Sequence, residues 1–336
     1  MSTTAEKPVS FKKADFVSDQ EVRWCPGCGD YAILSVVQQA FAELGVPKEK
    51  FVCVSGIGCS SRFPYYMDVY GFHGIHGRAP AIASGVKLAN RDLDVWVVTG
   101  DGDGLSIGGN HMIHAMRRNM NMKVLLFNNR IYGLTKGQYS PTSTKGTKSP
   151  STPFGSIDNP FNPIALALGA GASFVARAVD TQLKHLGAVL KAAHAHKGFA
   201  FVEILQNCVI FNDAVFEHFT DKTVRDERQV DLRPGQPLLY GKKLDKGLRI
   251  TPDAIELCAP AEASTWDPKE PSGANAYRIC QAPEDGQIPV PVGIFRDVEA
   301  PIFEDDIHRQ IHDAKIKMGE GSLKSLLTGG ETWTVK

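Results

Sequence analysis

Two of the seven cysteines form a C-x₂-C pair in the segment CPGCG at 25–29. Taken alone, this pair suits zinc, an iron–sulfur cluster or a redox-active dithiol. A zinc ribbon normally carries a second such pair nearby, and this chain has none. Cys59 and Cys208 instead stand singly, each near the end of an expected strand. The other three cysteines, at 53, 258 and 280, are expected to pack as small apolar residues.

A second group of residues suits a diphosphate and its metal ion. The segment GDG at 100–102 ends one expected strand, and Asn128 and Asn129 end the next. A carboxylate and an amide oxygen brought together at neighbouring strand ends form a hard oxygen site for Mg²⁺. The glycines let backbone N–H groups approach phosphate oxygens, and the N-terminus of the following helix adds a favourable dipole. GDG alone is common in loops, but the two motifs together predict a diphosphate and metal site.

The elements that must position these residues alternate between helices and strands. Apolar residues in 30–44 recur at the spacing of an amphipathic helix. Helices are expected near 30–44, 79–90, 108–119, 162–168 and 181–196, and strands near 51–56, 95–100, 123–129, 174–178 and 199–205. This order predicts an α/β fold with a doubly wound parallel sheet, which binds ligands at the carboxyl ends of its strands. The turns that bear Cys, Gly and Asn fall at those ends.

Three regions are expected along the chain. Residues 1–20 are polar and predict an N-terminal arm, and 21–229 form the domain with both sites. Beyond 230 the periodicity fades, which predicts an irregular C-terminal extension over 230–336 that packs on a partner or neighbouring subunit. The stretch 137–163 is rich in Ser, Thr, Pro and Gly, and is either a functional loop or disordered.

The composition excludes several classes of function. The 336 residues include 43% hydrophobic and 22% charged residues, which is ordinary for a globular protein. Basic and acidic residues balance at 37 each, so no net field favours nucleic acid or an anionic membrane as partner. No signal peptide or membrane span is expected, and the predicted location is cytoplasmic.

The span from GDG to NN resembles the fingerprint of enzymes that use thiamine diphosphate. The resemblance implies that Mg²⁺ is held by Asp101, Asn129 and the backbone carbonyl of Ile131, with Gly102 and Asp103 facing the diphosphate. A fold of the thiamine-diphosphate-binding type is implied as well. Four thiolates beside a redox-capable cofactor favour a [4Fe–4S] cluster over structural zinc.

The segments WCPGCG, GIGCSSR, GDG, YGLTKGQ and LQNC resemble, in this order, the β subunit of 2-oxoacid:ferredoxin oxidoreductases over about 20–215. GCSSR and IYGLTKGQYSPTS most resemble the 2-oxoglutarate branch. The resemblance implies four cluster ligands, which are Cys25, Cys28, Cys59 and Cys208. It assigns these further residues to the cofactor site: Ile57, Gly58, His76, Gly77, Gly100, Gly133 and Leu134.

The same resemblance implies roles for two basic residues. Arg62 is implied to bind the distal side of the 2-oxoacid, since a planar cation suits a carboxylate; the alternative is a surface arginine. Lys136 is implied on the coenzyme A side of the site, and the alternative is a solvated lysine. For His76 the alternative is a hydrogen-bonded loop histidine.

The implied reaction is the reversible, CoA-dependent oxidative decarboxylation of 2-oxoglutarate to succinyl-CoA and CO₂, with single electrons passing through the cluster to ferredoxin. No glutamate in this chain is an obvious activator of the cofactor. The resemblance assigns that glutamate to a partner α subunit, so the chain alone is expected to be inactive and an α₂β₂ assembly is expected. Three alternatives stay open: the same family acting on pyruvate, indolepyruvate or branched 2-oxoacids, a non-redox thiamine enzyme without a cluster, and a zinc-stabilised binding module without catalysis.

Overall fold

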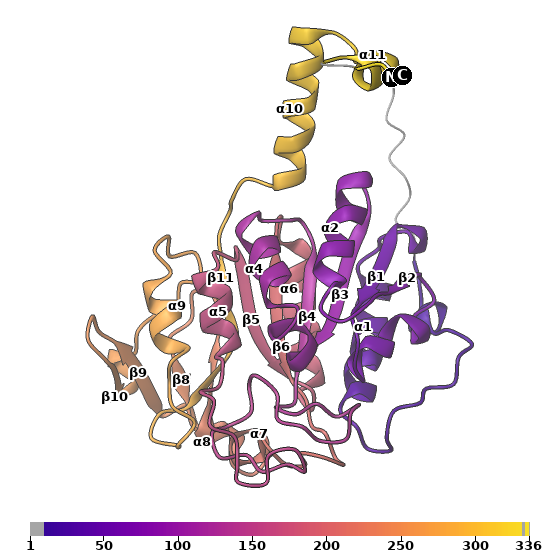
Figure 1. Ribbon diagram of the computed structural model, residues 1–336. Coiled ribbons are helices and arrows are strands. Elements are labelled where there is room, and N and C mark those ends of the chain that lie inside the picture. The colour runs from indigo at the N-terminus through magenta and orange to yellow at the C-terminus, as the bar shows by residue number, and fades with distance from the viewer. Residues whose placement is uncertain (1–9, 331–332, 336) are drawn as a thin grey trace.

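In the computed structural model, which describes residues 10–330 and 333–335, an eight-stranded sheet forms the centre of the molecule (Figure 1). Its strand order is β2-β1-β3-β4-β6-β5-β11-β7. The strands span β1 (Phe51–Ser55), β2 (Tyr70–His73), β3 (Asp94–Gly100), β4 (Lys123–Asn128), β5 (Phe174–Val179), β6 (Ala200–Leu205), β7 (Gln229–Leu232) and β11 (Val290–Asp297). All neighbours from β2 to β5 run parallel, β11 runs antiparallel to β5, and β7 is parallel to β11.

The central strands are buried on both faces. Every residue of β1, β4, β5 and β6 is buried. Continuous burial of this kind is typical of parallel sheets covered by helices on each side. The predicted doubly wound α/β fold is therefore confirmed.

Helices pack against each face of the sheet. One face is covered by α1 (Asp30–Glu43) and α6 (Leu183–Ala195), and the other by α2 (Ala79–Ala89), α4 (Gly109–Arg117), α5 (Pro163–Gly169) and α9 (Ala274–Ile279). Strand β3 divides its side chains between the two cores. Trp96 and Val98 join the α1/α6 core, while Val95 and Val97 join the other. This alternation follows from the two-residue period of a strand.

The structure contains elements that the sequence patterns did not predict. A short helix α3 (Asp101–Leu105) begins directly at the GDG turn and precedes α4. Strand β2 lies at the edge of the sheet with all four residues exposed, and its four-residue length leaves too short a pattern to predict a strand.

Part of the chain beyond 230 belongs to the main body. Strands β7 and β11 complete the main sheet, and Val292 and Phe295 are buried. Strands β8 (Leu239–Tyr240), β9 (Lys246–Ile250) and β10 (Ile255–Cys258) form a separate antiparallel sheet. Figure 1 shows α7 (Glu217–Thr220) and α8 (Arg225–Arg228) among loops at one end, while α10 (Phe303–Met318) and α11 (Leu323–Thr328) stand away at the other. The expected division at 230 and the subunit-packing role stay predictions.

The expected N-terminal arm lies partly outside the described residues, since 1–9 are not described. Phe16, in a 3₁₀ turn over 13–16, is fully buried. Its ring meets Phe41 of α1 and Phe51 of β1 at centroid distances of 5.8 Å. The described part of the arm is thus anchored in the core. Within 10–330 and 333–335, no helix has the length and apolarity that crossing a membrane requires.

Candidate functional site

A cavity of about 470 Å³ lies at the carboxyl ends of β1, β3 and β4. The turns that follow these strands supply most of its lining. The cofactor residues expected from the sequence all line it except Gly77: Ile57, Gly58, His76, Gly100, Asp101, Gly102, Asp103, Asn129, Ile131, Gly133 and Leu134. Cys59 lines the same cavity. The two groups of residues found in the sequence therefore meet at one place in the fold.

Gly77 lies directly behind this lining. Its φ is +65°, and a Cβ there would lie 2.4 Å from the backbone nitrogen of Gly108, so only glycine fits. The Gly77 N–H donates to Asp103 Oδ1 at 2.7 Å, and Thr99 Oγ1 donates to Asp103 Oδ2 at 3.0 Å. Asp103 therefore holds the turn that brings His76 to the cavity. Whether Asp103 also faces a diphosphate stays a prediction.

Asp101 is fixed by hydroxyl groups of the 137–163 stretch. Its Oδ2 accepts hydrogen bonds from Ser140 Oγ and Thr142 Oγ1, each at 2.5 Å. Thr142 Oγ1 also lies 2.9 Å from Asn128 Oδ1, so its single proton is shared between the two acceptors. Burial raises the pKa of Asp101, and the two hydroxyl donors oppose that rise. The stretch that was expected to be either functional or disordered thus holds the carboxylate of the GDG motif.

The second asparagine of the NN pair is oriented by Gln206, the residue that directly follows β6. Asn129 Nδ2 donates to Gln206 Oε1 at 2.7 Å, which fixes the orientation of the amide and so the position of Oδ1. Asn129 Oδ1 accepts from Ile131 N at 3.2 Å. Asp101, Asn129 and the Ile131 carbonyl offer only oxygen atoms at one cavity. This donor set fits Mg²⁺, a hard cation that prefers carboxylate and carbonyl oxygens.

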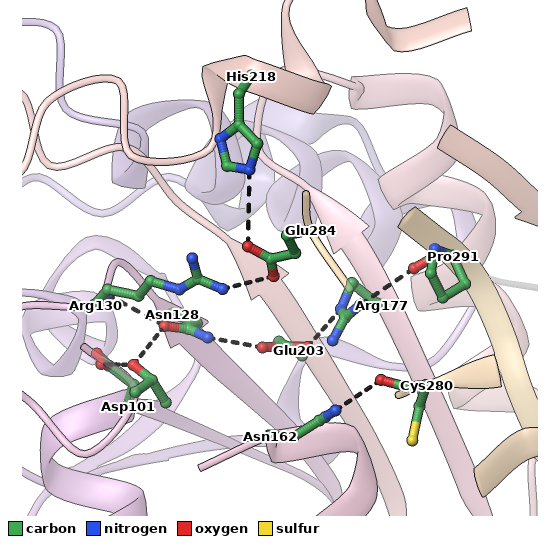
Figure 2. Close-up of polar contacts among 11 residues, drawn as sticks. Asp101, Asn128, Arg130, Asn162, Arg177, Glu203, His218, Cys280, Glu284 and Pro291 are labelled. Atoms are coloured by element: carbon green, nitrogen blue, oxygen red, sulfur yellow. Dashed lines mark hydrogen bonds and ion pairs between the residues drawn. The ribbon is translucent and has the colours of Figure 1, made fainter. Parts of the chain in front are cut away.

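Asn128 has a different role, as Figure 2 shows. Its Nδ2 donates to Glu203 Oε1 at 2.7 Å, and Arg177 Nε donates to Glu203 Oε2 at 2.7 Å. Arg177 also donates to the Pro291 carbonyl at 3.3 Å. These side chains join β4, β6, β5 and β11 in sheet order. Glu203 is 1% exposed. Replacing only one partner of the Arg177–Glu203 pair would leave the other as an unpaired buried charge, which costs stability. The C-terminal strand β11 therefore supports the site indirectly.

Two of the four cysteines expected to bind the cluster, Cys59 and Cys208, lie close to Gly133 in the cavity lining. Cys208 Sγ and Cys59 Sγ lie 3.5 Å and 3.7 Å from where a Gly133 Cβ would stand, so both sulfurs flank the same residue of the cavity lining. Cys28 N donates to the Cys25 carbonyl at 3.0 Å, which closes the CPGCG turn. Cys25 is exposed, while the other three are partly buried.

The surroundings of these thiols oppose their ionisation. Burial raises the pKa of Cys59 to about 12, and negative charge on Asp30, Cys208 and Cys25 adds to the rise. Burial and the charge of Asp30 also raise the pKa of Cys28. A bound cation would offset this effect and favour the thiolates. A cysteine that binds a metal loses its proton on binding. The donor set of four cysteines fits an iron–sulfur cluster.

The described residues contain no group of three or more His, Cys, Asp or Glu side chains with the spacing of ligands to one metal ion. Ligands of a [4Fe–4S] cluster each bind a different iron atom. They need not converge as closely as ligands of a single zinc ion.

Sequence patterns missed several residues of the site. Gln206 is 1% exposed, and its Nε2 donates to Cys28 Sγ at 3.2 Å while its Oε1 accepts from Asn129. It therefore contacts both the expected metal site and the expected cluster site, and its only signal was its position two residues before Cys208. Asp30 lines the cavity with 2% exposure, and burial together with the charge of Asp180 raises its pKa to about 7.

Two expected residues lie outside the cavity lining. Arg62 is exposed, with its guanidinium 5.6 Å from the Tyr65 ring centroid and its Nε donating to Tyr66 Oη at 3.2 Å. Lys136 is exposed in a left-handed turn with φ of 72°, and its N–H donates to the Gly133 carbonyl at 3.0 Å. Their assigned roles toward the 2-oxoacid and coenzyme A stay predictions.

Known proteins resemble this chain in both sequence and structure. The family model "Thiamine pyrophosphate enzyme, C-terminal TPP binding domain" matches residues 56–204. The 2-oxoglutarate oxidoreductase subunit KorB of Mycobacterium tuberculosis is 51% identical over 99% of this chain and 90% of its own length. The 2-oxoglutarate synthase subunit KorB of Methanocaldococcus jannaschii is 44% identical over 87% of this chain and 93% of its own length.

A solved structure resembles nearly the whole chain. It is 2-oxoglutarate:ferredoxin oxidoreductase from Magnetococcus marinus with 2-oxoglutarate, coenzyme A and succinyl-CoA bound. The TM-score is 0.77 at 35% identity, and the match covers 97% of this chain and 98% of that one.

Proposed function

This chain belongs to the family of 2-oxoacid:ferredoxin oxidoreductase β subunits, and from that premise we propose that it is the β subunit of a 2-oxoglutarate:ferredoxin oxidoreductase. The observation that carries the proposal is the shared cavity, where Cys59 lies together with Asp101 and Asn129. Thiamine diphosphate bound at Asp101 and Asn129 and a cluster bound at Cys59 would therefore lie next to each other, so electrons could pass from the first to the second. The 2-oxoglutarate branch is favoured because the relatives at 51% and 44% identity carry that substrate in their names.

The proposed reaction converts 2-oxoglutarate and CoA into succinyl-CoA, CO₂, one proton and two electrons. When bound, thiamine diphosphate supplies a carbon nucleophile for the 2-oxo carbon and an electron sink for loss of CO₂. The [4Fe–4S] cluster, when bound, supplies one-electron acceptance. Asp101, Asn129 and the Ile131 carbonyl would hold the Mg²⁺ that binds the diphosphate. Ser140 and Thr142 would keep the Asp101 carboxylate aimed at that ion.

A partner subunit is part of the proposal. Among the described residues, the carboxylates that line the cavity are all aspartates, and no glutamate is present there to activate the cofactor. Ile107 and Leu134 line the cavity while 56% and 53% exposed, so its mouth is apolar and open. An α subunit that closes this mouth would bury both side chains and could bring the missing glutamate. The isolated chain is therefore expected to be inactive.

The test is a reconstituted assay under strictly anaerobic conditions. The chain is coexpressed with an α subunit of the same family, and reduction of methyl viologen is followed with 2-oxoglutarate, pyruvate or no 2-oxoacid, with and without CoA. The proposal expects CoA-dependent reduction that is fastest with 2-oxoglutarate and absent for the chain alone. Faster turnover of pyruvate would move the chain to another branch of the family. CO₂ release without dye reduction would indicate a non-redox thiamine enzyme.

A further inference from the structure

A second hollow, of about 570 Å³, lies near the cysteine group at the same end of the sheet. The start of α6, helix α8 and the segment that joins β8 to β9 form its walls. Thr181 lines this hollow and also a smaller one beside Cys28. Asp180, the neighbour of Thr181, accepts from the backbone N–H of Asn207 at 2.9 Å, next to Cys208. The two hollows therefore meet at Thr181, two residues beyond the end of β5.

The hollow carries an excess of positive charge. Four lysines and arginines and two aspartates line it, namely Lys184, Arg225, Arg233, Lys242, Asp226 and Asp231. Each aspartate is paired with an arginine, at 3.4 Å in one case and 2.6 Å in the other. Lys184 and Lys242 form no ion pair with any residue in the described parts of the chain. Two uncompensated positive charges thus face solvent here.

Exposed leucines lie among these cations. Leu183 is 48% exposed and Leu244 is 59% exposed, and both line the hollow. Leu244 has a φ of 54°, a left-handed backbone conformation that is uncommon for a bulky residue. Strain of this kind tends to persist where function requires it. We call the set Leu183, Lys184, Arg225, Arg233, Lys242 and Leu244 the basic face.

We propose that the basic face is the docking surface for an acidic protein that carries single electrons away from the cluster. This inference rests on the proposed function, because only a bound cluster gives such a carrier its electron. The balanced reaction releases two electrons per 2-oxoacid, so two one-electron carriers are reduced per turnover while one proton is released.

The chemistry of the basic face suits a protein better than a small anion. Protein interfaces combine apolar side chains at their centre with a polar and charged rim, whereas a small anion gains nothing from exposed leucines. Complementary charge speeds the encounter of two proteins and orients them, and this effect weakens as salt is added. Thr181, which lines the same hollow as the basic face, also lines the hollow beside Cys28 of the expected cluster site.

The test compares two electron acceptors in the complete enzyme. The chain is coexpressed with its α subunit, and the rates of reduction of an acidic ferredoxin and of methyl viologen are measured. Lys184→Glu combined with Lys242→Glu should lower kcat/KM for ferredoxin by about tenfold at low ionic strength. It should leave the rate with methyl viologen unchanged. The matched control is Lys197→Glu, an exposed lysine beyond the other end of α6, which should change neither rate.

Each result of this comparison bears on either the docking surface or the proposed function. Unchanged ferredoxin reduction in the double variant overturns the docking surface while the proposed function stands. Loss of the α subunit from the double variant also overturns it, because the face would then be a subunit interface. An equal loss with methyl viologen would indicate a defect at the cluster or in folding, and again overturns it. A wild-type enzyme that reduces neither acceptor overturns both proposals.

A second variant probes the apolar part of the face. Leu244→Gly removes the exposed side chain, and glycine accepts a φ of 54° without strain. We expect its KM for ferredoxin to rise severalfold while its Tm stays at or above the wild-type value. An unchanged KM with a lower Tm would show that Leu244 serves stability and would contradict the docking role.

Discussion

Replacing Gln206 by leucine is the sharpest perturbation of this site, because one side chain contacts both proposed centres. Gln206 Nε2 donates to Cys28 Sγ at 3.2 Å and to the Asn207 carbonyl at 2.7 Å, and Oε1 accepts from Asn129. Gln206→Leu removes all three contacts in one step, with a side chain of similar size.

The expected shift in the reduction potential of the cluster follows from the hydrogen bond that Gln206 donates to Cys28 Sγ. A donor to a thiolate ligand stabilises the reduced, more negative cluster more than the oxidised one. If the hydrogen bond stabilises the reduced cluster by about 1 kcal/mol more than the oxidised cluster, its loss shifts the one-electron potential by about 40 mV. This follows because a tenfold change in an equilibrium constant corresponds to about 59 mV. Gln206→Leu should therefore make the cluster potential more negative by about 40 mV. An EPR-monitored redox titration measures it.

The expected change in Mg²⁺ affinity follows from the hydrogen bond between Gln206 and Asn129. Loss of a partner that orients a metal ligand typically costs about 10- to 100-fold in metal affinity. Gln206→Leu should weaken Mg²⁺ binding by this factor, whereas Gln206→Glu keeps the acceptor and should largely preserve it. Gln38→Leu is the matched control, because Gln38 is also buried and makes one hydrogen bond away from the cysteines. Unchanged potential and Mg²⁺ affinity in Gln206→Leu, or equal shifts in the Gln38 variant, would refute the reasoning.

Four further predictions concern other parts of the chain. Thr142→Val removes one hydroxyl that orients the metal ligand, and should weaken Mg²⁺ binding about tenfold in a titration followed by tryptophan fluorescence. Gly77→Ala places a Cβ 2.4 Å from the Gly108 nitrogen, and should abolish the rise in Tm that thiamine diphosphate and Mg²⁺ produce. Burial raises the pKa of Glu304. As pH rises, the unfolded chain loses the Glu304 proton before the folded chain does, so the folded wild type loses stability. Glu304→Gln should therefore be as stable as wild type at about pH 4 and more stable than wild type at about pH 8, as measured by thermal unfolding. Arg62→Ala should raise KM for 2-oxoglutarate much more than for pyruvate, and equal effects would remove its assigned role.

The sequence predicted those parts of the site that come from local motifs at strand ends. Asp101, Asn129 and Cys59 were placed together because each follows a strand in a parallel sheet, and the carboxyl ends of such strands share one edge. All three residues line one cavity. What they bind stays a prediction, since it rests on donor chemistry and resemblance.

The parts that were missed depend on contacts between distant segments. Thr142 reaches Asp101 across 41 positions, and Gln206 reaches Cys28 across 178. Neither contact leaves a periodic pattern or a fixed spacing in the chain. The same holds for β11, which joins the sheet antiparallel to β5 after a long stretch whose sequence shows no regular helix–strand alternation. Buried polar partners are chosen by the folded geometry, so hydrophobic periodicity cannot reveal them.

The central claim is that one site in this chain couples a thiamine-dependent reaction to an iron–sulfur cluster bound by four cysteines. The most direct test is EPR spectroscopy of the anaerobically purified complex with its α subunit, frozen after 2-oxoglutarate is added without any external acceptor. The account predicts about four iron atoms per chain and the signal of a reduced [4Fe–4S] cluster that grows when CoA is also present. Colourless protein without iron, or a cluster that 2-oxoglutarate and CoA leave oxidised, would contradict it.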